Sequence, residues 1–302
     1  MNKNPFFSVV IPTFNQDSFL KKAINSVLQQ TFKDFEIIII DNNSTDNTEE
    51  TVKYFNLENI QYEKISNGGI IAKSRNLGIK KAKGKWIAFL DSDDDWESEK
   101  LDKVYNIIKN NSADVVSTNM WIKEEGKLKR KIYKYGPFRT NFYKILIKFG
   151  NRISTSASVV KKEFLVKYNI MFSEKSEIVT TEDFDFFLNI SRKNARFYFI
   201  DLPLGTHSVH QKSASSNFNK HNMALKHVLK DHVFNKQDFE PNKNKLWKEV
   251  EGNYNLRFVL QKIKIEKFNI SNFYLLVKNL IKNPKNSLIF LTRLIKNKLL
   301  SY

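Results

Sequence analysis

The chain of 302 residues is long enough for one large domain or for a domain with an appendage, and its hydrophobic content of 41% supports a sizeable core. Fifty Lys and Arg against 32 Asp and Glu give a net charge of +18, which favours anionic partners such as a nucleotide, a nucleic acid or a membrane surface. The absence of cysteine excludes disulfides and thiolate chemistry, and the apolar pattern predicts neither a secretory signal nor a membrane span.

The first ninety residues alternate short apolar runs with segments of helical spacing. Strands are expected at 6–11 (stopped by Pro12), 35–40, about 60–65 and 86–90, and helices are expected from Asp17 or Ser18, over 48–55, and from the turn Asn67-Gly68-Gly69 to about residue 82. The second run is apolar on both faces, as in a buried parallel sheet. This order predicts a doubly wound, Rossmann-like nucleotide-binding half.

An acidic run follows the fourth expected strand. Asp91, Asp93, Asp94 and Asp95 place four carboxylates within five residues, and these charges repel one another unless a cation neutralises them. Hard oxygen ligands suit Mg2+ or Mn2+, which also bridge a diphosphate, and ligands of α/β sheets bind at the carboxyl ends of strands. The alternative is that Asp94 or Asp95 caps a helix that begins near Trp96.

Beyond residue 110 strands and helices are mixed. Strands are expected at 114–120 and 197–200, a hairpin through Glu125-Gly126, helices at 162–168 and after a cap at Thr180 or Thr181, and a polar loop over 207–216. This pattern adds further strands to the first half and so predicts one larger α/β domain, which we place at residues 1–240.

Residues 241–302 form a basic tail, with 13 Lys and Arg against three Glu. Apolar spacing predicts three helices, near 246–263, 273–281 and 288–299. Apolar faces edged by lysine are typical of helices that lie on a membrane surface, and the alternative is packing on the rest of the protein or on another subunit.

Four motifs resemble the family 2 glycosyltransferases of GT-A fold. They are Ser8-Val9-Val10-Ile11-Pro12-Thr13-Phe14-Asn15, Ile40-Asp41-Asn42-Asn43-Ser44-Thr45-Asp46, Arg75-Asn76-Leu77-Gly78-Ile79 with Ala82-Lys83-Gly84, and Leu90-Asp91-Ser92-Asp93-Asp94. The resemblance is close from residue 6 to about 105 and looser to about 216. It implies an α/β GT-A fold with a mixed central sheet, extended here by C-terminal helices, a Mn2+ or Mg2+ cofactor, and a UDP-sugar donor.

The resemblance also implies which residues bind the donor. The expected set is Pro12, Thr13, Asn15, Asp41, Asn42, Asn67, Arg75, Asp91 and Ser92. Asn42 departs from the Asp-Asp pair of many relatives, although its amide still accepts a hydrogen bond from uracil N3–H. Arg75 matches an arginine near the base, with a plain salt bridge as the alternative, and Asn67 is expected to shape the pocket wall.

The expected metal-site residues are Asp93, Asp91 and His210. By resemblance Asp93 ligates the metal, and Asp91 contacts either the ribose or a metal-bound water. His210, with Ser213 and Ser215, is similar to a late loop that the family places over the diphosphate, and His207 is the alternative.

Asp183 looks like the second residue of the family's Glu-Asp pair. It is therefore expected to act as the general base that takes the acceptor's proton, with inversion at the anomeric carbon. Glu182 and Asp185 compete for this role, and the alternative is that all three acids only favour a helix N-terminus.

The sequence thus predicts a bacterial, inverting, metal-dependent transferase. It would move a hexose or N-acetylhexosamine from a UDP-sugar to a lipid-linked oligosaccharide or a surface polysaccharide, on the cytoplasmic side of the cell membrane and held there by the tail. Alternatives are a non-catalytic nucleotide-sugar-binding protein, a nucleotidyltransferase (disfavoured because residues 12–15 lack a glycine and a basic residue), and a nucleic-acid-binding protein. The last is not expected, because the basic residues gather in the helical tail and not on an aromatic platform.

Overall fold

A computed structural model of the chain describes residues 4–126, 131–210 and 217–266, and a few positions between 274 and 292. These residues gather into two compact units, one formed by 1–140 with 152–217 and the other by 141–151 with 218–302. The domain end that the sequence places at residue 240 stays a prediction.

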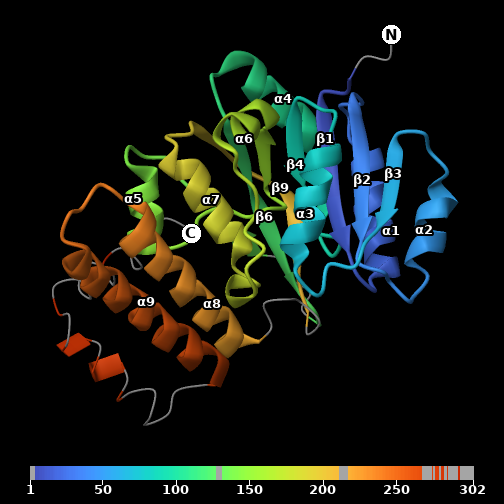
Figure 1. The fold of residues 1–302 in the computed structure, drawn as a ribbon. Helices are drawn as coiled ribbons and strands as arrows, with labels where there is room; N and C mark the ends of the chain where they lie inside the picture. The colour runs from blue at the N-terminus through green and yellow to red at the C-terminus, as the bar shows by residue number, and fades with distance from the viewer. Residues whose placement is uncertain are drawn as a thin grey trace. The chain divides into compact units, whose positions relative to one another are not determined.

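The first unit is built on one mixed sheet (Figure 1). Its strands are β1 Phe7–Thr13, β2 Phe35–Asp41, β3 Ile60–Lys64, β4 Trp86–Phe89, β5 Asp95–Trp96, β6 Val115–Glu124, β7 Lys131–Tyr133, β8 Ser158–Lys161 and β9 Phe197–Val209. They are ordered β3-β2-β1-β4-β8-β6-β9-β5, and β7 pairs with β6 outside this path. The mixed sheet and the Rossmann-like first half confirm the predicted fold class.

The first four strands are parallel, and β1 lies between β2 and β4. The strand predicted to stop at Pro12 runs on to Thr13. Leu90 N–H donates to Val10 O, so the backbone N–H and C=O of Val10 point toward β4. The backbone groups of Pro12 point the same way, because Pro12 lies two residues later in the strand. Pairing with β4 ends at Val10, and the N–H that proline lacks is therefore not needed there.

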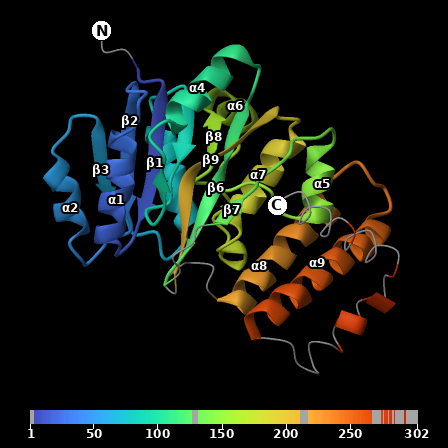
Figure 2. The same ribbon diagram turned by 180° about the vertical axis from the view of Figure 1, so that it is seen from behind.

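Helices cover both faces of the sheet, as the two opposite views show (Figures 1 and 2). The helices of this unit are α1 Asp17–Leu28, α2 Thr48–Phe55, α3 Ile71–Lys81, α4 Lys100–Asn110, α6 Lys162–Tyr168 and α7 Glu182–Arg192. On one face α1 and α4 bury apolar stripes against Val9, Ile11 and Ile37. On the other face Gly78 brings α3 close to β1, because a Cβ there would lie 2.2 Å from Val10 Cγ1.

Strand β9 is longer than the sequence predicted. It extends from Phe197 to Val209, whereas the prediction ended the strand at Ile200 and placed His207 in a polar loop. Parallel pairing with β6 continues along this length through two register shifts, and Thr206 also pairs with Asp95 of β5. The predicted hairpin is confirmed by the antiparallel pairing of β6 with β7.

The second unit contains α5 Phe142–Phe149, α8 Phe218–Asp231 and α9 Lys243–Glu266. Helix α9 confirms the first helix predicted in the tail, and it buries Leu246, Val250 and Val259. Lys148 pairs with Glu249 at 2.6 Å, and Asn253 Nδ2 donates to Lys148 O at 3.0 Å, which joins α9 to α5. The first tail helix therefore packs within this unit.

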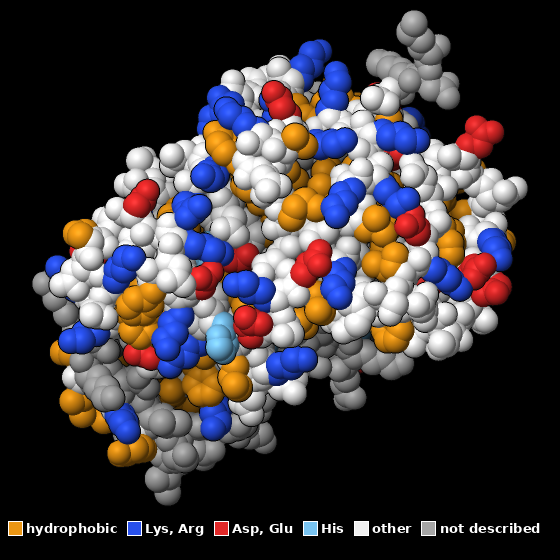
Figure 3. Space-filling view, in the orientation of Figure 1, with side chains coloured by type: hydrophobic (Ala, Val, Ile, Leu, Met, Phe, Trp, Pro, Cys, Tyr) orange, Lys and Arg blue, Asp and Glu red, His pale blue; other side chains and the backbone are white. Residues whose placement is uncertain are grey.

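The second and third predicted tail helices lie outside the continuously described residues. Among the residues that the structure describes, no helix has the length and apolar character needed to cross a membrane. On the face drawn in Figure 3 the Lys and Arg side chains are dispersed, with Asp and Glu side chains among them.

Candidate active site

The order of the strands predicts a ligand-binding site, called the crevice below, at the carboxyl ends of β1 and β4. Strands β2 and β3 are added on one side of β1, and the chain then crosses from β3 to place β4 on the other side. Ligands of open α/β sheets bind at such a reversal, outside the carboxyl ends of the strands. The predicted donor residues follow β1, β2 and β3 here, and the acidic run follows β4.

The loops after β1 and β2 are tied together by Asn15. Asn15 adopts φ +49°, a conformation that asparagine tolerates better than most residues, and its N–H donates to Ser44 Oγ at 2.8 Å. Its Oδ1 accepts from Thr45 N–H at 2.8 Å. Asn15 therefore shapes the loop that Pro12 and Thr13 enter, while the neighbouring Phe14 ring is 53% exposed.

Asp41 is fully buried at the end of β2. Its Oδ1 accepts from Ser44 N–H at 3.0 Å and from Ser44 Oγ, and its Oδ2 accepts from Tyr62 Oη at 2.7 Å. Burial and this hydrogen bond raise the pKa of Tyr62 well above its usual range. The carboxylate is thus satisfied by the protein itself and holds the loop in place.

Asn42 and Asn67 connect the ends of β2 and β3. Asn42 N–H donates to Thr13 O at 3.0 Å, and Asn42 Oδ1 accepts from Asn67 N–H at 2.8 Å. The buried Asn67 side chain donates to Ser74 Oγ at 2.9 Å and accepts from Gly69 N–H. The structure therefore brings the predicted donor residues of three loops into one hydrogen-bonded rim.

The acidic loop contains two kinds of carboxylate. Asp94 is buried, and its Oδ1 lies 3.1 Å from His207 Nδ1 and accepts from Ser208 N–H at 3.0 Å. Burial alone would lower the pKa of His207, but the charge of Asp94 raises it to about 9. Asp94 thus anchors the loop to β9, and the alternative that Asp94 or Asp95 caps a helix is wrong, because Asp95 begins β5 and α4 begins only at Lys100.

Asp93 is crowded by the other carboxylates of the acidic loop. Burial and the charges of Asp94 and Asp91 raise the pKa of Asp93 to about 6. His210 Nε2 lies 3.0 Å from Asp93 Oδ2, and the His210 ring stacks on Phe19 at 5.0 Å. The structure therefore brings the predicted pair of Asp93 and His210 together, while Ser213 and Ser215 lie outside the described residues.

Arg75 joins the acidic loop to α7. Its two terminal nitrogens lie 2.7 Å from Asp91 Oδ1 and 2.7 Å from Glu182 Oε1, and the guanidinium is buried. Burial alone would lower the pKa of Arg75, but the charges of Asp91 and Glu182 outweigh it and raise that pKa. The salt-bridge alternative for Arg75 is thus what the structure contains, and it uses Glu182 as a structural partner.

Asp183 is half-buried at the first turn of α7. Burial and the charge of Glu182 raise the pKa of Asp183 to about 7, and Asp183 Oδ1 accepts from Phe184 N–H at 2.7 Å. A carboxylate with this pKa is suited to take a proton near neutral pH. Asp185, which competes with Asp183 for this role by sequence, is 3% exposed and accepts from Asn189 Nδ2 at 2.9 Å.

Three further contacts were not expected from the sequence. Ser92 Oγ donates to Gln16 Oε1 at 2.5 Å, which directs this predicted donor residue toward α1. Thr155 and Ser156 contact Asp91, and Lys100 is fully buried beneath the loop. The only signals for these residues are the hydroxyl-rich stretch 154–158 and a lysine directly after Glu99, and neither pattern is specific.

Asp91 and Asp93 fit a hard divalent cation, because Mg2+ and Mn2+ prefer oxygen ligands of this type. A bound cation would also relieve the repulsion between carboxylates that raises the pKa of Asp93. Among the described residues, no group of three or more His, Asp or Glu side chains is arranged as a complete metal site.

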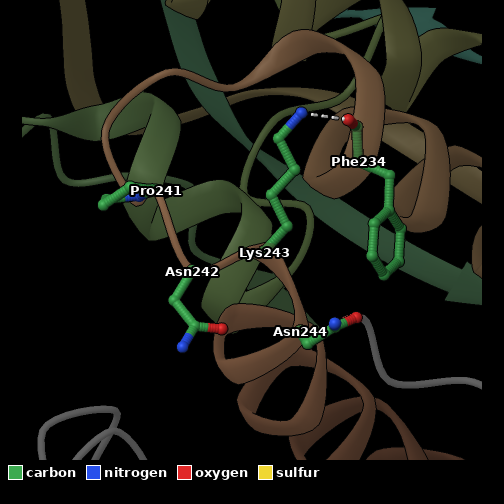
Figure 4. A pocket seen from close by; sticks show the side chains of 5 residues that line it. All are labelled: Phe234, Pro241, Asn242, Lys243 and Asn244. Atoms are coloured by element: carbon green, nitrogen blue, oxygen red, sulfur yellow. Dashed lines mark hydrogen bonds between the residues drawn. The ribbon is translucent and has the colours of Figure 1, made fainter.

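A separate pocket lies in the second unit (Figure 4). It is lined by Phe234, Pro241, Asn242, Lys243 and Asn244, and Lys243 Nζ donates to Phe234 O at 2.6 Å. Its lining contains no carboxylate and none of the predicted site residues, so it offers none of the chemistry of the crevice.

The sequence and the fold of the chain both match known proteins. Residues 8–164 match the family described as Glycosyl transferase family 2. The Staphylococcus aureus poly(ribitol-phosphate) beta-N-acetylglucosaminyltransferase TarP is 31% identical over 250 residues, covering 76% of this chain and 74% of TarP. The crystal structure of S. aureus TarS 1–349 in complex with UDP-GlcNAc is similar in fold, with a TM-score of 0.65 and 22% identity over 91% of this chain and 79% of that one. This likeness confirms the predicted GT-A fold.

Other relatives match over shorter regions. A Campylobacter jejuni GalNAc(5)-diNAcBac-PP-undecaprenol beta-1,3-glucosyltransferase is 31% identical over 54% of this chain and 48% of its own length. An uncharacterized glycosyltransferase of Rickettsia bellii is 39% identical over 46% of this chain, but the match spans only 20% of that protein.

Proposed function

The chain belongs to glycosyl transferase family 2, and from this premise we propose that it is an inverting, metal-dependent transferase that moves a hexose or N-acetylhexosamine from a UDP-sugar to an acceptor hydroxyl. The observation that carries the proposal is the Arg75 bridge. It links Asp91 of the acidic loop to Glu182, the neighbour of Asp183, through two contacts of 2.7 Å. The bridge supports the proposal because it brings the acidic loop, where the diphosphate would bind, close to the carboxylate proposed as the base.

Donor binding is assigned to the rim and to the acidic loop. The uracil and ribose of the donor would lie over the loop that contains Pro12, Thr13 and Asn15, bounded by Asn42 and Asn67. Asp91 and Asp93, with His210 beside Asp93, would hold Mn2+ or Mg2+ together with the diphosphate. When bound, the cation supplies positive charge that offsets the charge developing on the leaving phosphate.

Asp183 is assigned as the general base. The acceptor oxygen forms its bond to the anomeric carbon while the bond from this carbon to the β-phosphate oxygen breaks. UDP leaves with the electron pair, and the acceptor's proton passes to Asp183, whose pKa of about 7 suits that transfer. Attack on the face opposite to UDP inverts the anomeric centre.

The acceptor is proposed to be a lipid-linked oligosaccharide or a surface polysaccharide. Support comes from the names of TarP, which acts on poly(ribitol-phosphate), and of the C. jejuni relative, which acts on an undecaprenol-linked glycan. We place the enzyme on the cytoplasmic side of the membrane, held at its surface by the basic residues of 241–302.

The transfer itself is tested by incubating the full chain with a panel of UDP-sugars and Mn2+ and measuring UDP release with and without glycan acceptors. Release that depends on one UDP-sugar supports the proposal. No release with any donor, together with UDP binding, would instead support a non-catalytic nucleotide-sugar-binding protein.

The tail's role is tested by sedimentation with vesicles of anionic and of neutral lipid. The full chain is expected to sediment with anionic vesicles, and a chain ending at residue 270 to sediment less while still hydrolysing donor. Equal sedimentation of both chains would exclude the tail as the membrane contact.

A further inference from the structure

We propose that the segment Thr155–Ala157 positions Asp91, and through it the acidic loop, for the donor's diphosphate and cation. This inference rests on the proposed function, since it assigns two positioning residues to the site described above. Thr155 and Ser156 are buried, and each contributes its hydroxyl group to a different part of Asp91.

The contacts fix both the backbone and the side chain of Asp91. Ser156 Oγ accepts from Asp91 N–H at 3.1 Å, and Thr155 Oγ1 donates to Asp91 Oδ2 at 3.3 Å. The other carboxylate oxygen, Oδ1, is bound by Arg75 at 2.7 Å. One donor on each oxygen sets the plane of the carboxylate, while the side chain remains 25% exposed toward the crevice.

The orientation of Asp91 is passed on to the rest of the loop. Asp94 N–H donates to Asp91 O at 3.0 Å, which closes a turn that contains Ser92 and Asp93. A shift of the Asp91 backbone would therefore move Asp93 as well. Partners that orient a ligating carboxylate in this way commonly matter almost as much as the ligand itself.

The segment is itself held from beneath by two buried side chains. Trp96 Nε1 donates to Ser156 O at 2.8 Å, and Lys100 Nζ donates to Ala157 O at 3.2 Å and to Thr118 Oγ1 at 3.0 Å. The Lys100 ammonium also lies 5.1 Å from the centre of the Trp96 ring. Burial lowers the pKa of Lys100 to about 7, and its hydrogen bond to Ala157 O ties this side chain to the segment that contacts Asp91.

Ser158 provides a matched control. It is a buried serine two residues further on, and its Oγ donates to Ser154 O at 2.7 Å and lies 3.1 Å from Ser117 Oγ. Neither contact reaches the acidic loop. Ser158→Ala should therefore cost stability comparable to that lost in Ser156→Ala without disturbing Asp91.

The experiment measures UDP binding by calorimetry, with Mn2+ and with chelator, for the full chain and for Thr155→Val, Ser156→Ala, Thr155→Ser and Ser158→Ala, together with each Tm. We expect Thr155→Val and Ser156→Ala to weaken Mn2+-dependent UDP binding about 10-fold, while Ser158→Ala and the hydroxyl-retaining Thr155→Ser bind like wild type. Thr155→Val preserves the shape of its side chain and serves where Ser156→Ala fails to fold.

Wild-type affinity in Thr155→Val would overturn the inference, as would an equal loss in Ser158→Ala at equal Tm. A wild-type chain that binds no UDP would overturn the proposed function, and this result is recognised before any variant is compared.

Discussion

Asp41 ends one buried parallel strand of the sheet and Asp93 follows another, yet their carboxylates lie in opposite surroundings. Asp41 accepts hydrogen bonds from Ser44 and Tyr62, which satisfy it within the protein. Asp93 meets His210 but is crowded by Asp91 and Asp94, and its pKa rises to about 6. The carboxylate in the rim is therefore satisfied by hydrogen bonds within the protein, whereas we propose that the charge of the acidic loop is balanced by a bound cation.

The largest effect is expected from removing the base. Asp183→Asn cannot accept a proton, so kcat should fall by about 10²–10⁴-fold while UDP binding with Mn2+ is unchanged. Steady-state kinetics and calorimetry measure the two quantities. If kcat survives, Glu182 or another group is the base.

Replacing Asp93 tests the carboxylate that we expect to bind the cation. Asp93→Asn should lower kcat/KM by roughly 100-fold, because a ligand for the charge-stabilising cation is lost, and folding should be little affected. Asp94→Asn is the control from the same loop, since it removes the negative charge that faces His207 and should instead lower Tm. A lower Tm in Asp93→Asn with unchanged kcat/KM would reverse the two roles.

The pH profile tests the raised pKa of Asp183. This group must be ionised to act as a base, so kcat should fall by about tenfold per pH unit below pH 7 and reach a plateau above it. Proton competition for Asp93 below about pH 6 would act in the same direction. A flat profile from pH 5 to 8 would contradict the assignment.

The smallest effect on catalysis is expected from replacing Asp41, whose carboxylate already accepts hydrogen bonds within the protein. Asp41→Asn puts an amide NH2 in place of one of the two oxygens that accept from Ser44 and Tyr62, and it should lower the free energy of unfolding by about 1–3 kcal/mol. UDP affinity should change only a few-fold, because the rim is displaced but the acidic loop is not. Chemical denaturation measures the first effect, and an intact stability with lost binding would show that Asp41 contacts the nucleotide directly.

The sequence predicted the elements where one local rule dominates. Within β2, Ile37–Ile40 is apolar on both faces because it lies inside a parallel sheet, and the helix expected at 162–168 has those bounds in the structure. It missed the extension of β9 through His207, since polar residues there pair with β6 and β5, which are distant in sequence. Strand pairing of that kind leaves no periodic signal.

The same limit applies to the site. Motifs placed Asp91, Asp93 and Asp183 correctly at the ends of a strand and a helix, because those positions follow from chain order. They did not show that Arg75 joins Asp91 to Glu182, 107 positions from Arg75, or that Lys100 lies buried beneath the loop. Such contacts depend on tertiary packing and become visible only in the folded structure.

Titration of the wild-type chain with UDP in Mn2+ and again in excess chelator tests the central claim most directly. If the carboxylates of the acidic loop seat a cation that offsets the diphosphate, UDP should bind in Mn2+ and lose most of its affinity in chelator. Equal affinity in both conditions would contradict this account.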